Sequence, residues 1–177
     1  EVKGQKRQLN RARNQAAVLE RVLRELERAA AKARREALVP DRTPAVPAPA
    51  RSLGKGPWPV LGEVLADFGQ PRAAGKMRWD GVLIAAPAGT EVRATQPGQV
   101  VYADWLPGLG LLLVLDHGGG YLSLYGHNQD LTRQVGDRLA AGDVFAHVGD
   151  TGGQARPALY FELRQNGRPV NPRLWGN

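Results

Sequence analysis

Residues 149–164 read GDTGGQARPALYFELR and join a glycine turn to an alternating strand. The pair Gly152-Gly153 is typical of a tight turn between two elements. After the turn, Leu159, Phe161 and Leu163 alternate with small or polar residues, as in a strand that buries one face. This stretch therefore predicts an exposed turn that leads into a strand packed against an apolar core.

Similar short runs recur from residue 58 to the end, and turn signals containing glycine or proline separate them. No segment of this region shows a helical period. Residues 58–177 are therefore expected to form a compact, mainly β domain, either a β-sandwich or an open barrel. The predicted strands are Gly81–Ala86, Glu91–Thr95, Gln99–Asp104, Leu111–Asp116, Tyr121–Tyr125, Asp143–Val148 and Ala158–Arg164.

Residues 1–39 have a different pattern, in which apolar residues recur at alternating spacings of three and four. This a/d seam runs over about four heptads and predicts a long coiled-coil-type helix that meets another helix rather than a broad core. A solvated basic helix is the alternative reading. The seam residues are Leu9, Ala12, Ala16, Leu19, Leu23, Leu26, Ala30, Ala33 and Ala37.

Five prolines in residues 40–57 predict an extended linker that ends the helix near Val39. The expected organisation is a helix over 1–39, a linker over 40–57 and a β domain over 58–177. Because the helical pattern is already running at Glu1, we expect the chain to be part of a longer coiled-coil protein without its signal peptide.

The net charge of +7 is unevenly distributed along the chain. Residues 1–39 carry +6, residues 40–57 carry +2, and residues 58–177 carry −1. A nucleic-acid-binding domain needs a basic face of its own, so nucleic acid is not an expected partner. The absence of cysteine excludes disulfides, thiolate zinc sites and a cysteine nucleophile. No apolar run reaches the roughly 18 residues of a membrane span.

The order of motifs across 58–177 resembles the LytM or M23 zinc-peptidase domain. The similar stretches are Phe68–Arg72, Ala86–Val92, Gly98–Val101, Leu115–Gly118, Leu124–His127, Val135–Asp137, Ala141-Gly142, Gly149–Gly153, Tyr160–Glu162 and Val170–Pro172. The resemblance implies the fold of that family, with its groove.

Active members of the resembled family bind zinc through a His-x-x-x-Asp motif and the second His of a His-x-His motif. Here the first motif falls on Trp79 and Leu83, and the second falls on Ala158 and Tyr160. Because zinc needs about three nitrogen or oxygen ligands, we expect no metal, no cofactor and no hydrolysis.

Because side chains alternate along a strand, the residues between the core-facing ones should face the groove. They include aromatic and apolar side chains with charged neighbours. Such a composition is typical of a protein-binding surface, although simple decay of the metal site would also leave apolar residues there. The candidate binding residues are Trp79, Asp80, Leu83, Trp105, Leu109, His127, Tyr160, Glu162 and Arg164. His117 and His147 are expected to be structural.

A coiled-coil segment, a linker and a metal-less LytM domain together resemble EnvC-type division proteins. That resemblance implies a non-enzymatic activator of periplasmic N-acetylmuramoyl-L-alanine amidases that split septal peptidoglycan. It also implies a signal from the FtsEX complex through the coiled coil, and capture of an inhibitory amidase helix by the groove.

Two alternatives stay open at this stage: a peptidoglycan-binding module, and a zinc endopeptidase with unorthodox ligands. The tethered helix adds a regulatory expectation, since Leu19, Leu23 and Leu26 are placed to cover the groove unless they are needed for coiled-coil pairing.

Overall fold

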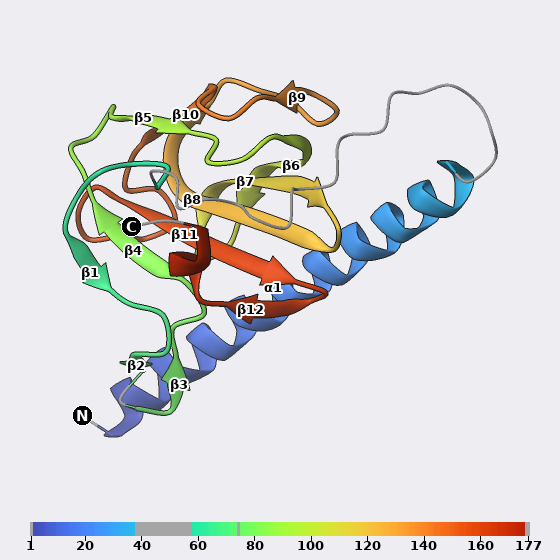
Figure 1. Ribbon diagram of the computed structural model, residues 1–177. Coiled ribbons are helices and arrows are strands. Elements are labelled where there is room, and N and C mark those ends of the chain that lie inside the picture. The colour runs from blue at the N-terminus through green and yellow to red at the C-terminus, as the bar shows by residue number, and fades with distance from the viewer. Residues whose placement is uncertain (1, 38–57, 74, 176–177) are drawn as a thin grey trace.

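The computed structural model describes residues 2–37, 58–73 and 75–175 (Figure 1). The elements are α1 (Val2–Ala37), β1 (Val64–Ala66), β2 (Pro71–Arg72), β3 (Met77–Arg78), β4 (Val82–Ala85), β5 (Glu91–Arg93), β6 (Gly98–Leu106), β7 (Gly110–Gly118), β8 (Tyr121–Leu131), β9 (Arg138–Leu139), β10 (Val144–Val148), β11 (Ala158–Gln165), β12 (Arg168–Val170) and a 3-10 helix (Pro172–Trp175).

All seven predicted strands are present, as β4, β5, β6, β7, β8, β10 and β11. The elements that sequence patterns did not indicate have two to four residues each, which is too short to give a period: β1, β2, β3, β9, β12 and the 3-10 helix. The proline-rich segment and the predicted helix end at Val39 lie outside the described residues.

The main sheet runs in the order β1-β4-β11-β8-β7-β6-β9, with antiparallel neighbours throughout. Strand β10 pairs with both β8 and β5, so the sheet branches and its branch adds a second layer. The main core lies between these layers, and Phe161, Tyr125 and Phe145 form its aromatic centre. The predicted mainly β, M23-like architecture is confirmed.

The opposite face of the sheet is covered by α1, which crosses it and projects beyond its edge (Figure 1). Leu19 and Leu23 are buried against residues of β6, β7 and β8, namely Leu106, Leu112, Val114, Leu122 and Leu124. The expectation that the seam meets another helix is wrong for these residues. Val18, Val22 and Leu26 also pack here, so the apolar stripe is wide enough to lie on a sheet.

In the described part of the chain, no helix is both long enough and apolar enough to cross a lipid bilayer.

Candidate functional site

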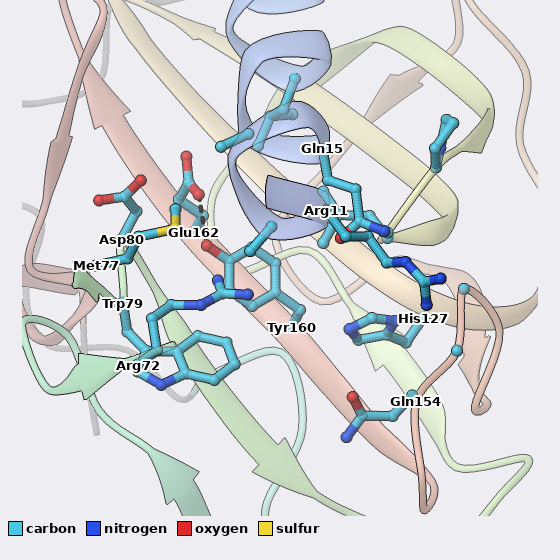
Figure 2. Close-up of a pocket in the computed structure, with 18 of the residues that line it drawn as sticks. Arg11, Gln15, Arg72, Met77, Trp79, Asp80, His127, Gln154, Tyr160 and Glu162 are labelled. Atoms are coloured by element: carbon cyan, nitrogen blue, oxygen red, sulfur yellow. Dashed lines mark hydrogen bonds between the residues drawn. The ribbon is translucent and has the colours of Figure 1, made fainter. Parts of the chain in front are cut away.

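A cavity of about 330 Å³ lies between the first half of α1 and the groove face of the β domain (Figure 2). The helix forms one wall, and strand residues and turns form the other. The lining residues are Arg11, Ala12, Gln15, Ala16, Leu19, Arg72, Met77, Arg78, Trp79, Asp80, Pro107, Gly108, Leu109, His127, Gly152, Gly153, Gln154, Tyr160 and Glu162.

Tyr160 lies at the centre of the groove floor, on β11. It packs with Leu83, Ala66 and Ala158 in a small apolar cluster that is separate from the main core. Gly81 permits this packing, because a Cβ there would lie 2.5 Å from the Phe161 carbonyl oxygen and 3.0 Å from the tyrosine ring. The predicted alternation of β11 is therefore confirmed, with Leu159 and Phe161 on the opposite, core side.

Trp79 extends the aromatic surface beside Tyr160, with their ring centroids 6.2 Å apart. The Arg72 guanidinium lies over the indole at 4.2 Å from its centroid, in the geometry of a cation–π contact. Figure 2 shows both side chains next to Tyr160, where they line the cavity. The groove thus presents two neighbouring aromatic rings, tilted relative to each other, with a positive rim.

A chain of polar contacts leads from Tyr160 to the helix. The Tyr160 hydroxyl donates to Glu162 Oε1 at 2.6 Å, and Arg164 Nε donates to the other carboxylate oxygen of Glu162. Arg164 Nη2 then lies 2.6 Å from Glu20 Oε1 of α1. Because Arg164 is 1% exposed and Glu162 is fully buried, their ion pair is shielded from solvent, whereas Glu20 is partly exposed.

Burial dominates the ionisation of this site. It raises the pKa of Glu162 and of Asp80, and it raises the pKa of Tyr160 well above its ordinary value. Burial alone would lower the pKa of Arg164, but the carboxylates of Glu162 and Glu20 outweigh it and raise that pKa. Arg164 therefore stays charged, and Tyr160 stays a neutral hydrogen-bond donor.

His127 forms part of the cavity wall at a strained backbone position, with φ of 64°. Its amide donates to the Leu109 carbonyl at 2.6 Å, and its Nδ1 donates to the Thr151 carbonyl at 2.7 Å. Burial lowers the pKa of the imidazole, which favours the neutral ring. The ring packs edge-on to Tyr160, with centroids 6.4 Å apart, and so serves as a fixed polar wall.

Most of the predicted binding residues are brought together here. Those that line the cavity are Trp79, Asp80, Leu109, His127, Tyr160 and Glu162. Leu83 lies beside Tyr160 as its register partner on β4, and Arg164 is held between the carboxylates of Glu162 and Glu20. Trp105 is a correction: it lies on β6, is 51% exposed and does not line the cavity. β6 continues through Trp105 to Leu106, and the chain reaches the cavity only with the residues that follow, Pro107, Gly108 and Leu109.

Sequence patterns did not single out Arg72, Met77, Gln154, Arg11, Gln15 and Glu20 as groove residues. Arg72 belongs to a quoted family motif, which was the one available signal. The helix residues gave none, because a heptad pattern does not reveal what the helix packs against.

The donor chemistry of the groove does not fit the zinc ion of the resembled family. Trp79 and Leu83, at two of the three ligand positions, offer no nitrogen or oxygen lone pair for a metal. At the third position, the Tyr160 hydroxyl donates its hydrogen to Glu162. We therefore derive no chemical step through a metal at this site.

The other two histidines lie away from the groove. His117 is buried, its Nδ1 donates to the Pro97 carbonyl, and its Nε2 lies 2.6 Å from Ser123 Oγ. Burial lowers its pKa to about 4. His147 on β10 pairs with Asp130 at 2.6 Å. Both contacts fit the structural roles expected from the sequence.

The sequence profile of peptidase family M23 matches residues 77–172. The chain belongs to peptidase family M23. Its M23 domain is also similar in structure to a zinc-containing peptidase from Vibrio cholerae, with a TM-score of 0.61 and 27% identity, over 64% of this chain and 37% of that chain.

Two relatives of the M23 domain have named roles. Murein hydrolase activator EnvC of Escherichia coli is 48% identical over 122 residues, which are 69% of this chain and 29% of that protein. Cell division protein DipM of Caulobacter vibrioides is 33% identical over 132 residues, which are 71% of this chain and 21% of that protein. The chain thus spans less than a third of the length of either relative. The resemblance to EnvC-type proteins is confirmed.

Proposed function

We propose that this chain is a non-catalytic activator of periplasmic N-acetylmuramoyl-L-alanine amidases, and that its M23 groove binds a helix of the amidase. In this proposal the activated amidase splits septal peptidoglycan, and the FtsEX complex signals through the helical part of the protein. The name of the EnvC relative supports murein hydrolase activation, and the name of DipM supports a role in division.

One observation carries the proposal: the groove already holds an amphipathic helix of its own chain. Leu19 lines the cavity beside Tyr160, and Glu20 reaches the buried Arg164. A peptidase groove would instead have to admit an extended peptide beside a metal. Aromatic and arginine side chains in a desolvated pocket are the usual anchors of protein interfaces. Helix-in-groove binding is thus the activity that these side chains favour.

The same geometry makes α1 a cover for the groove. An amidase helix and α1 would use the same surface, so activation requires α1 to leave. Its departure would expose Leu19, Leu23 and the Arg164 side chain, and an incoming helix would have to satisfy Arg164 with a carboxylate in place of Glu20. The tether through residues 38–57 keeps the cover at a high effective concentration.

The direct test is activation of a purified cognate amidase on labelled sacculi, with binding measured in parallel. Tyr160→Ala and Leu83→Asp should each weaken amidase binding about thirtyfold or more, because a buried interface anchor contributes about 2 kcal/mol or more. Trp105→Ala is the matched control, since it removes an exposed aromatic residue of the same domain outside the cavity. It should activate normally.

Tyr160→Ala only removes atoms from the cavity wall that faces α1, so tighter closure by α1 is not the expected cause of a loss of activation. Normal activation by folded Tyr160→Ala and Leu83→Asp proteins would place the binding surface elsewhere. Stoichiometric zinc in the purified protein, together with cleavage of peptidoglycan peptides, would replace the proposal with a peptidase. Binding to purified sacculi without amidase binding would instead indicate a wall-binding module.

A further inference from the structure

Helix α1 separates its charges between two faces. The basic residues with described side chains are exposed, and all except Arg11 fall within an arc of about 120° opposite Leu19 at 100° per residue. These residues, called the basic stripe below, are Lys3, Lys6, Arg7, Arg13, Arg21, Arg24, Arg28, Lys32 and Arg35. The stripe runs straight for about 48 Å, at 1.5 Å per residue.

The acidic residues of the helix are arranged differently. Glu20 pairs with Arg164, and Glu27 lies against Gly167 with one buried carboxylate oxygen. Among the described side chains of α1, Glu25 is the acid on the exposed side. Glu20 and Glu27 thus face the β domain, while the basic stripe faces solvent.

The stripe cannot be accounted for by the groove. Leu19 and Leu23 point into the domain, so the stripe on the opposite side of α1 points away from it. Arg11 lines the cavity and does not belong to the stripe. The charge therefore serves solubility alone or a partner outside the site already described.

We propose that the basic stripe binds the surface of a lipid bilayer that contains anionic phospholipids. A straight, one-sided row of cations matches a flat layer of anionic headgroups, where each Lys or Arg near the surface strengthens binding about fivefold. Protein interfaces instead concentrate aromatic side chains, and α1 contains no aromatic residue. The helix therefore also lacks the aromatic side chains on which the sugar rings of a glycan chain would stack.

This contact is electrostatic and does not require insertion. The apolar face of α1 is already packed on the sheet, so only charged side chains reach the lipid. Binding should therefore depend steeply on salt, because the screening length falls from about 10 Å at 0.1 M to about 3 Å at 1 M. An inserting amphipathic helix would retain much of its affinity at high salt.

The test is co-sedimentation of the full chain with vesicles of phosphatidylglycerol and phosphatidylethanolamine, and separately with vesicles of phosphatidylcholine, at about 50 mM salt. The wild type should bind the anionic vesicles and release at about 1 M salt. The combined variant Arg21→Gln, Arg24→Gln, Arg28→Gln removes three stripe charges and should lose about a hundredfold in partitioning. The variant with glutamate at the same three positions reverses these charges and should lose more.

The matched control is Lys76→Glu, Arg156→Glu, Arg168→Glu, which makes the same charge change at exposed positions of the β domain. It should bind as the wild type does. An equal loss of vesicle binding in this control would show that binding depends on the net charge of the chain and not on the basic stripe. Equal binding to phosphatidylcholine, unchanged binding of the stripe variants, or binding to purified sacculi without binding to vesicles would each overturn the proposal.

Discussion

Leu23→Ala tests whether α1 is held on the groove face by its apolar side chains. Leu23 is 2% exposed and packs in the cluster that joins the helix to β6, β7 and β8. Truncation of a buried leucine to alanine costs about 2–5 kcal/mol. Alanine favours the helix as much as leucine does, so the cost falls on docking rather than on helix formation.

A loss of about 3 kcal/mol corresponds to about a hundredfold shift from the docked to the undocked helix. Amide hydrogen exchange measures that shift segment by segment, because local opening and global unfolding expose different amides. Exchange in α1 should accelerate strongly, while the central strands β7 and β8 should change little. Arg24→Ala is the control, because the neighbouring Arg24 is exposed.

Affinity for the amidase should rise in Leu23→Ala as well. The rise is limited by the wild-type ratio of molecules with α1 docked on the groove to molecules with α1 undocked. Unchanged exchange in α1, relative to Arg24→Ala, would show that leucine packing does not hold the helix. Faster exchange without tighter amidase binding would show that α1 and the amidase use different surfaces.

Three further changes test the surrounding chemistry. Glu20→Gln should weaken docking of α1 by about 1 kcal/mol, seen as faster exchange in the helix; the effect is modest because Glu20 is 38% exposed and Arg164 keeps Glu162. Unchanged hydrogen exchange in α1 would show that the Glu20–Arg164 ion pair does not contribute to docking of the helix. Burial lowers the pKa of His117 to about 4, so the folded protein favours the neutral ring. The resulting stability is fully present above pH 6.5 and should be lost as pH falls toward 4. Denaturant unfolding should show about 3 kcal/mol of this loss in the wild type and not in His117→Gln, and parallel pH curves would refute it. Gly81→Ala should lower the free energy of unfolding by about 1–3 kcal/mol, because its Cβ would collide with the Phe161 carbonyl and crowd Tyr160; an unchanged melting temperature would contradict this packing.

The long strands of the M23 domain were predictable because they alternate or lie between glycine turns. β11 shows the reason, since Leu159 and Phe161 enter the core while Tyr160 enters the groove. The assignment of Trp79, Leu83, Ala158 and Tyr160 to the family's zinc motifs rests on the sequence motifs alone and stays a prediction. The two-residue strands β2 and β3 could not be predicted, because they form one small hairpin whose pairing leaves no period in the sequence.

The sequence left two packing partners open for α1, another helix or the groove of the β domain, and could not decide between them. A seam at alternating spacings of three and four fits another helix or a sheet, and only the flanking Val18 and Val22 widen it here. Glu20 gave no signal either, since a single carboxylate among many charges on a helix is usually solvated. Its partner Arg164 is separated from it by more than 140 positions, and only the folded sheet brings the two together.

The two faces of α1 predict that a membrane alone does not open the groove. Closure depends on Leu19, Leu23 and Glu20, which face the domain, whereas the basic stripe faces away. A bilayer that contacts only the stripe binds the docked and undocked helix with similar strength through its charges, and a ligand without differential affinity shifts no equilibrium. Anionic vesicles should therefore leave hydrogen exchange in α1 at its vesicle-free rate, while a peptide that competes for the groove should accelerate it. Faster exchange of α1 on vesicles alone would mean that its apolar face enters the lipid, and that the membrane itself competes with the groove for this helix.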